Sequence, residues 1–281
     1  MSAAVMATPH RQATSISFIP REHGATAMLL IPFFSAAILA REWRWTEVPA
    51  LVAAVATFAA KDPLVVLARQ RWIWKQHRPE TEAAKTWLMG TTLVLAACGL
   101  LLAATWPIWT LAIVGTGAAA FSGLAVMVSV KNRQRSTLFQ IASALALSAT
   151  SLAACLSATG AIQPWCWGLW ALSAIQATAG ILVVHARLDA RIALRKLTPE
   201  EGTWRRPAMV AAFVLVFAAL VAACARQPWI AAALCLAGAG YLYDLRRQKE
   251  PAWLQLPLKQ VGLQALALSI AYALMIVAGL W

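Results

Sequence analysis

The chain has 281 residues, of which 61% are hydrophobic and 12% are charged, and its mean hydropathy is +0.67. Soluble domains carry about a quarter charged residues, so this composition excludes a soluble domain and indicates an integral membrane protein. The net charge of +13 would suit nucleic acid, but the basic residues lie in short clusters between apolar runs. Because that placement follows the positive-inside rule, we expect membrane lipids and no nucleic acid as partners.

A polar N-terminal segment precedes a series of apolar runs long enough to cross a bilayer. We expect residues 1–18 to form a disordered polar tail and residues 19–281 to form a single transmembrane domain. The sequence predicts an all-α bundle of about nine transmembrane helices, because apolar residues cover all faces of each run. The expected spans are Ala25–Ala40, Val48–Ala68, Leu88–Thr105, Pro107–Val130, Leu138–Ala158, Trp165–Val184, Pro207–Ala225, Trp229–Tyr243 and Val261–Leu280.

The basic residues alternate with these spans. Most of the 24 fall before the first span or after the even-numbered spans, whereas Arg41, Arg44 and Arg226 fall in the other loops. This asymmetry predicts a bacterial cytoplasmic membrane protein with its N-terminus in the cytoplasm and its C-terminus outside. Most of the 14 tryptophans lie near the expected helix ends, as an aromatic belt requires.

Two classes of small residue are interpreted as packing elements. The five cysteines, Cys98, Cys155, Cys166, Cys224 and Cys235, are odd in number and show no CxxC spacing. We interpret them as small buried residues rather than metal ligands or disulfides. The stretches 115–117 and 238–240 contain paired glycines, which predict close approach between helices.

The first candidate site is the pair Lys61-Asp62, which precedes Pro63 within the second expected span. Ionisable groups at membrane depth are costly, so this pair is a functional candidate. Successive residues of a helix point about 100° apart, and at least one member therefore needs a partner elsewhere. The alternative is a helix that ends earlier and leaves the pair among lipid headgroups.

The second candidate site follows the sixth span, which we expect to continue as a helix beyond the lipid. In this segment His185 and Asp189 are four residues apart, as are Arg187 and Arg191. Asp189 is placed to orient His185, while the arginines present guanidinium groups to an anion. Ordinary snorkelling with an ion pair is the alternative. The segments 204–207 and 257–260 are basic and lead into helices, whose N-termini favour anions.

The third candidate site is the opening segment Pro20-Arg21-Glu22-His23-Gly24-Ala25-Thr26-Ala27-Met28. It resembles the start of the YwiC-like family of bacterial membrane proteins, which begin with a P-basic-x-H-G-A-W-A-M segment and an apolar run. Thr26 stands where that pattern has tryptophan. The resemblance covers about ten residues, is supported by length and helix number, and implies no settled activity.

The expected plan is also similar to that of intramembrane prenyltransferases of the UbiA type, which have nine helices and polar cytoplasmic segments after the second and sixth. That resemblance implies aspartate-rich motifs that bind magnesium diphosphate. The chain contains three aspartates, Asp62, Asp189 and Asp244, which are far apart in the sequence. We therefore expect no metal site and no cofactor, with cations in place of the magnesium-binding acids.

These features together predict a basic pocket that faces the cytoplasm and binds a phosphorylated or otherwise anionic lipid or metabolite. The expected anion-binding residues are Arg21, Lys61, Arg187 and Arg191. His23 and His185 are the candidates for proton exchange near neutral pH, should the site be catalytic. A small-anion transporter and a non-catalytic membrane assembly partner are the alternatives, and the sequence leaves enzymatic activity and oligomeric state open.

Overall fold

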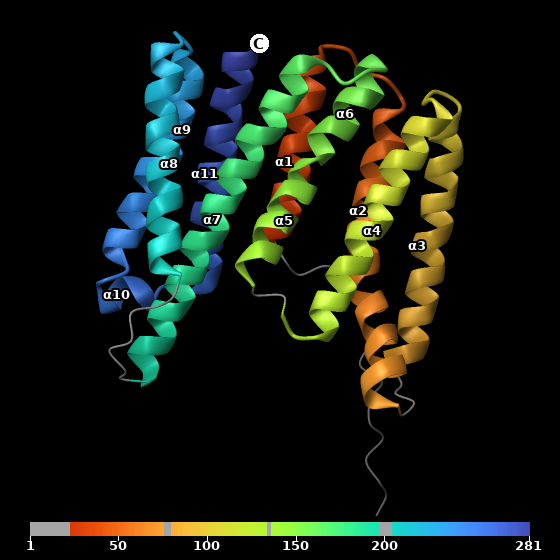
Figure 1. Ribbon diagram of the computed structural model, residues 1–281, viewed down its shortest axis with the longest axis horizontal. Coiled ribbons are helices and arrows are strands. Elements are labelled where there is room, and N and C mark those ends of the chain that lie inside the picture. The colour runs from red at the N-terminus through yellow and green to blue at the C-terminus, as the bar shows by residue number, and fades with distance from the viewer. Residues whose placement is uncertain (1–22, 76–79, 134–135, 197–203) are drawn as a thin grey trace, which may run out of the picture.

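The computed structural model describes residues 23–75, 80–133, 136–196 and 204–281 (Figure 1). Regular structure in these residues is helical throughout. The helices are α1 (His23–Ala40), α2 (Glu47–Arg69), the π-helix η1 (Gln70–Trp74), α3 (Glu80–Ala103), α4 (Ile108–Val130), α5 (Thr137–Ser148), α6 (Thr150–Thr159), α7 (Pro164–Lys196), α8 (Arg205–Cys224), α9 (Pro228–Arg247), α10 (Pro251–Leu254) and α11 (Leu258–Leu280).

The described residues form eight helical segments that are long and apolar enough to cross a membrane, with α5 and α6 counted as one segment. The first helix, α1, is a shorter apolar helix of the same bundle. The prediction of an all-α multi-pass protein with about nine transmembrane helices is therefore confirmed. Apolar side chains are exposed along most of these helices, as a lipid environment requires.

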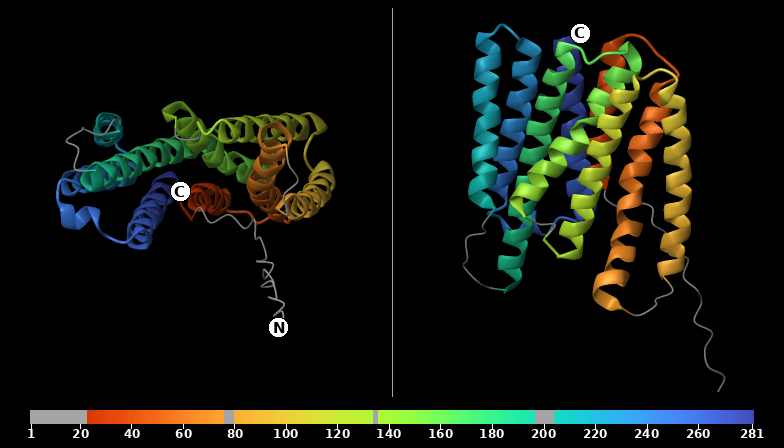
Figure 2. Two further views of the ribbon diagram at one scale, coloured as in Figure 1. Left: turned by 90° about the horizontal axis from the view of Figure 1, so that it is seen from below. Right: turned by 45° about the vertical axis from the view of Figure 1, so that its right-hand side comes forward.

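The helices run roughly side by side and form a bundle that is longer than it is deep (Figure 2). At one side α8 packs on α9, at the other side α2 packs on α3, and α1 lies in the middle between α6 and α11. The buried core runs along α1, α7, α8 and α9 and is built largely from alanine and leucine. Small side chains at the interfaces allow the helices to approach closely.

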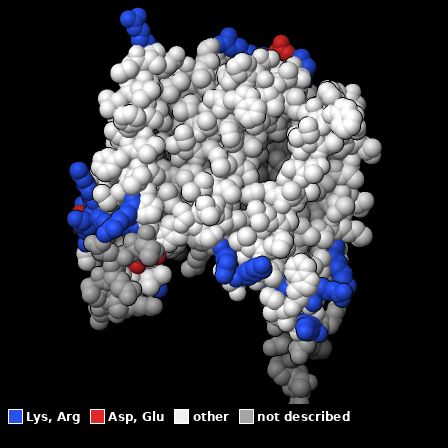
Figure 3. Space-filling view, in the orientation of Figure 1, with Lys and Arg blue, Asp and Glu red and all other residues white. Residues whose placement is uncertain are grey.

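The bundle has two chemically different ends, separated by a belt without Lys, Arg, Asp or Glu on the face in Figure 3. We name the end at which α7 ends and α8 begins the basic end, since most of the described Lys and Arg residues belong to it (Figure 3). The opposite end, which contains Trp281, is named the far end. Among the described residues its Lys and Arg side chains are Arg41, Arg44 and Arg226.

The fifth expected span is divided at Ala149, between α5 and α6. The hydroxyl of Thr150 lies 2.7 Å from the carbonyl of Leu29 in α1 and 2.9 Å from the carbonyl of Leu147, and the hydroxyl of Ser151 donates to the carbonyl of Ser148 at 2.9 Å. Such bonds compete with the backbone ladder and bend helices. The sequence analysis did not predict this break because the composition of the span remains apolar across it.

Three other boundaries bear on the candidate sites. The second helix continues past Pro63 to Arg69, so the alternative of an earlier end is wrong. The sixth expected helix does extend beyond its apolar part, since α7 runs to Lys196. The short helix α10 was not predicted. It lies between α9 and α11 at the basic end (Figure 1).

The two glycine-rich stretches behave differently. A Cβ atom added to Gly238 in α9 would lie 2.7 Å from Cγ2 of Val216 in α8, which shows how closely these helices approach. A Cβ atom added to Gly115 or Gly117 in α4 would meet nothing within 4 Å. The packing interpretation is therefore confirmed for 238–240 and wrong for 115–117. Gly115 and Gly117 therefore face open space rather than a neighbouring helix.

Candidate functional site

The predicted site residues of α7 lie at the basic end and form bonds with α9 and α10. Arg187 is 2% exposed. Its Nη1 donates to Oδ1 of Asp244 at 3.1 Å, and its Nη2 donates to the carbonyl of Trp253 at 2.6 Å. A nearly buried guanidinium thus has one carboxylate and one backbone oxygen as acceptors.

Arg191, one helical turn further along α7, binds the backbone that follows. Its Nε donates to the carbonyl of Leu254, and its Nη2 donates to the carbonyl of Leu256 at 2.5 Å. These carbonyls belong to the last residue of α10 and to the chain just after it, where a helix leaves its carbonyls without intrahelical partners. Arg191 therefore caps the C-terminus of α10 with a positive charge.

Asp244 in α9 is the common acceptor of this region. Besides Arg187, it accepts hydrogen bonds from Nε1 of Trp253 at 2.7 Å and from Nε2 of Gln248 at 2.9 Å. Arg247 lies with its Cζ 4.9 Å from the centre of the Trp253 ring, within cation–π range, and pairs with Glu250 at 3.1 Å. We name Arg187, Arg191, Arg247, Asp244 and Trp253 the arginine cluster.

Two guanidinium nitrogens of the arginine cluster have unused hydrogen-bonding capacity. Nε of Arg187 and Nε of Arg247 are buried and have no acceptor among the described residues. The cluster also contains more guanidinium groups than carboxylates. Its chemistry therefore favours an additional acceptor that carries negative charge.

His185 lies close to the start of α8. Its ring stacks on the ring of Trp204, with centroids 4.5 Å apart and planes at 22°. The backbone N–H of Trp204 donates to Oδ2 of Asp189 at 3.4 Å. Through both contacts, Trp204, the residue before α8, packs against α7. The orientation of His185 by Asp189 stays a prediction.

Lys61 lies on another part of the bundle. Its Nζ is 3.9 Å from Oδ1 of Asp62, and the two side chains are 25% and 47% exposed. Lys61 is eight residues, or about 12 Å of helix, from Arg69 at the end of α2. The main neighbours of α2 are α3, α4 and α6, whereas the arginine cluster belongs to α7, α9 and α10. The structure therefore does not bring Lys61 together with the α7 arginines.

The opening segment is described only in part. Arg21 lies outside the residues that the structure describes, and for His23 only its position as the first residue of α1 is described. Within the described ranges, no group of three or more His, Cys, Asp or Glu side chains is arranged to hold a metal ion.

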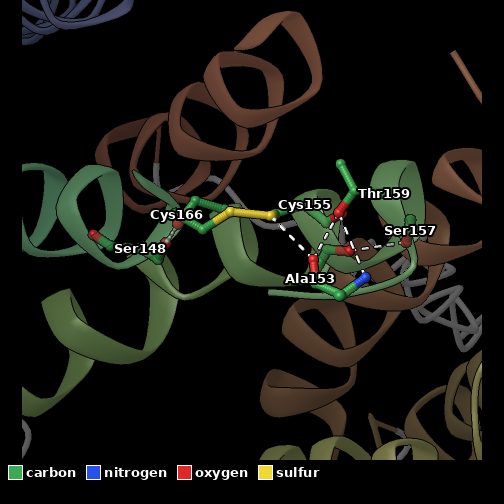
Figure 4. Close-up of a disulfide and its surroundings, with 8 residues drawn as sticks. Ser148, Ala153, Cys155, Ser157, Thr159 and Cys166 are labelled. Atoms are coloured by element: carbon green, nitrogen blue, oxygen red, sulfur yellow. Dashed lines mark hydrogen bonds between the residues drawn. A yellow bond between two sulfur atoms is a disulfide. The ribbon is translucent and has the colours of Figure 1, made fainter. Parts of the chain in front are cut away.

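The interpretation of the cysteines is wrong for two of them. Cys155 in α6 and Cys166 in α7 form a disulfide at the far end, with Cα atoms 6.5 Å apart (Figure 4). Cys98, Cys224 and Cys235 are free thiols. A signal was present in the sequence, because Cys155 and Cys166 flank a single loop that the charge pattern assigns to the outside. Asp244 and Trp253 were also missed, because their partners are distant in the sequence.

Comparison with known proteins identifies one relationship. Residues 19–155 match the family described as YwiC-like protein. The match starts before α1 and ends within α6, so it includes Lys61 and leaves out the arginine cluster. No curated protein and no solved structure matches the chain, and the similarity in plan to UbiA-type enzymes stays a prediction. Over residues 19–155, slightly less than half of its length, the chain is thus similar to the YwiC-like family.

Proposed function

We propose that the chain is a multi-pass protein of the bacterial cytoplasmic membrane whose basic end faces the cytoplasm and binds an anionic ligand. The ligand is a lipid headgroup or a phosphorylated metabolite. The distribution of Lys and Arg supports this orientation. The disulfide at the far end supports it independently, because disulfides persist on the oxidising side of a membrane.

The arginine cluster is the observation that carries the proposal. Arg187 and Arg191 together bind the carbonyls of Trp253, Leu254 and Leu256. Three oxygen atoms are thus held by two neighbouring guanidinium groups, as the oxygens of a phosphate would be. Charged oxygens accept stronger hydrogen bonds than neutral carbonyls, so a phosphate is able to compete with α10 for the arginines.

In this proposal the described arrangement is the closed form of the site, with α10 in the place of the ligand. Displacement of α10 would expose Arg187 and Arg191 to an anion, and Nε of Arg187 and of Arg247 would gain an acceptor. His185, on the same helix, is the group for proton exchange if the site is catalytic. Arg21, which lies outside the described residues, and His23 at the start of α1 remain proposed contributors, whereas Lys61 lies on another part of the bundle and is not one.

Native mass spectrometry of the protein extracted from membranes with phosphatidylglycerol tests the proposal. We compare wild type with Arg191→Ala, and use Arg195→Ala as the matched control, because Arg195 is an exposed residue one turn further along α7. We expect retained phosphatidylglycerol to fall at least about tenfold in Arg191→Ala, which corresponds to about 1.4 kcal/mol. Equal retention in all three proteins, with Arg191→Ala less stable, would show that Arg191 only caps α10.

Anion transport is a second candidate function, which the break between α5 and α6 favours. Discontinuous helices near the middle of the membrane form the binding sites of many transporters. The hydroxyl of Ser148, beside the break, is buried and has no partner among the described residues. Chloride uptake by proteoliposomes that depends on Ser148 would favour transport, and no uptake by wild type would exclude chloride as the transported anion.

A further inference from the structure

A cavity of about 370 Å³ lies at the far end of the bundle. Its wall is formed by the loop between α1 and α2, the loop between α3 and α4, and the end of α6. The residues that matter here are Trp43, Arg44, Trp45, Thr46 and Trp106. The cavity is distant from the arginine cluster, which lies at the opposite end of α7 and α9.

Three indole rings line this cavity. Trp43 and Trp45 are exposed, whereas Trp106 is 5% exposed. Nε1 of Trp106 is buried and has no acceptor among the described residues. Buried polar groups are almost always hydrogen-bonded, so this N–H is available to a bound molecule.

A buried carboxylate lies beside the same wall. Glu47, the first residue of α2, follows the cavity residue Thr46 and is 1% exposed. Its Oε1 accepts from the backbone N–H of Arg44 at 3.3 Å, while its Oε2 has no donor among the described residues. The hydroxyl proton of Thr46 is not available to a ligand, since it is donated to the carbonyl of Ser157 at 2.7 Å.

The charge at this cavity does not resemble that of the basic end. Arg44 forms an ion pair with Glu42 at 3.2 Å, and Glu47 adds a carboxylate. The unused groups are therefore the N–H donor of Trp106, which lines the cavity, and the Oε2 acceptor of Glu47, which directly follows the lining residue Thr46. A hydroxyl group satisfies both, because it accepts from an indole and donates to a carboxylate. Indole faces also provide flat apolar surface for the C–H faces of a sugar or polyol.

We propose that this cavity binds a small polyhydroxylated group, either a sugar or a glycerol moiety. The group is presented as the headgroup of a membrane lipid or as a free molecule, and the same contacts recognise both. Trp106 donates to one hydroxyl, and the exposed indoles cover the ligand at the mouth of the cavity. This site is independent of the anion site proposed for the basic end.

The test uses full-length protein in nanodiscs, which avoids detergents with sugar headgroups. Nanodiscs contain phosphatidylcholine alone, or phosphatidylcholine with either monoglucosyl diacylglycerol or phosphatidylglycerol. Retained lipid is measured by native mass spectrometry, and free glucose is titrated in a separate arm by saturation-transfer NMR. We compare wild type with Trp106→Phe, which removes the N–H and keeps an aromatic ring. Trp229→Phe is the matched control, since Trp229 is an exposed tryptophan at the far end outside the cavity.

We expect saturable binding of at least one of these probes by wild type and by Trp229→Phe, with affinity at least about tenfold lower in Trp106→Phe. Binding of lipid without glucose assigns a headgroup ligand, and binding of glucose assigns a free sugar. If Trp106→Phe does not fold, Trp45→Ala replaces it, because Trp45 is exposed and lines the same cavity. No saturable binding of any probe by wild type, or equal binding by the cavity variant, would overturn the proposal and leave buried water as the partner of these groups.

Discussion

The side of the bundle formed by α7, α8 and α9 and the side formed by α2, α3 and α4 contain the same kinds of sequence feature. Each has an arginine or lysine within an apolar helix and a pair of nearby glycines. On the α7–α9 side the arginine pairs with another helix, and Gly238 allows a close helix contact. On the α2–α4 side the lysine pairs loosely with its chain neighbour, and Gly117 faces open space.

This difference shows that a charge or a glycine in a membrane helix acquires its role from the neighbouring helix. Partners of Arg187 come from α9 and α10, which are about 60 residues away in the sequence. A charge with such partners stabilises the fold. A partly exposed ion pair between chain neighbours, such as that of Lys61 and Asp62, contributes less to stability.

The largest difference in stability is expected between variants of the two ion pairs, Arg187–Asp244 and Lys61–Asp62. Arg187→Ala leaves Asp244 in α9 without its main cationic partner, and such changes cost about 3–5 kcal/mol of the free energy of unfolding. Lys61→Ala affects a partly exposed pair and should cost less than about 1 kcal/mol. Thermal unfolding of both variants in the same detergent measures the difference. Equal losses would contradict the contrast between the two sides.

Removal of the disulfide should cause the next largest loss of stability. The bond connects α7 with α6, and α6 packs on α1 and α2. Replacement of both Cys155 and Cys166 by alanine should lower the free energy of unfolding by about 2–4 kcal/mol. Cys224→Ala, an exposed free thiol, serves as the control and should change stability by less than about 0.5 kcal/mol. Stability of wild type that does not respond to reductant would argue against the bond.

The glycines should show a smaller contrast. Gly238→Ala places a methyl group 2.7 Å from Cγ2 of Val216 and should cost about 1–3 kcal/mol by overpacking. Gly117→Ala has open space around the new methyl group. Because alanine is the better helix former, this variant should gain up to about 1 kcal/mol. A stabilising Gly238→Ala would mean that α8 and α9 are further apart than described.

The smallest loss of stability is expected from the removal of a hydrogen bond between α7 and α9. Nε2 of Gln176 donates to the hydroxyl of Tyr241 at 2.8 Å, and both side chains are buried. Tyr241→Phe should cost about 0.6 kcal/mol, the average for interhelical bonds in membranes. Tyr243→Phe, at an exposed position of the same helix, should have no measurable effect. If Tyr241→Phe and Tyr243→Phe had the same unfolding midpoint, this hydrogen bond would contribute little to stability.

The fold was predictable because hydropathy is a local property. Runs of apolar residues defined the spans, and the extension of α7 followed from its polar but periodic sequence. The break at Ala149 was not predictable in the same way, since it depends on where the hydroxyls of Thr150 and Ser151 find acceptors. Local composition does not contain that information.

The candidate site was predictable only as a set of residue types. The spacing of Arg187 and Arg191 correctly placed both on one face of a helix at the basic end. Their partners, Asp244 and the carbonyls after α10, are set by tertiary packing. The same limit applies to Arg44 and Trp106, which line the far-end cavity from separate loops.

Hydrogen–deuterium exchange of residues 251–257, with and without phosphatidylglycerol in the nanodisc, tests the central proposal most directly. If an anionic headgroup takes the place of the α10 carbonyls on Arg187 and Arg191, exchange in this segment becomes faster when phosphatidylglycerol is present, while exchange in α3 stays the same. Unchanged exchange in residues 251–257 while phosphatidylglycerol is bound would show that the arginine cluster only supports the fold.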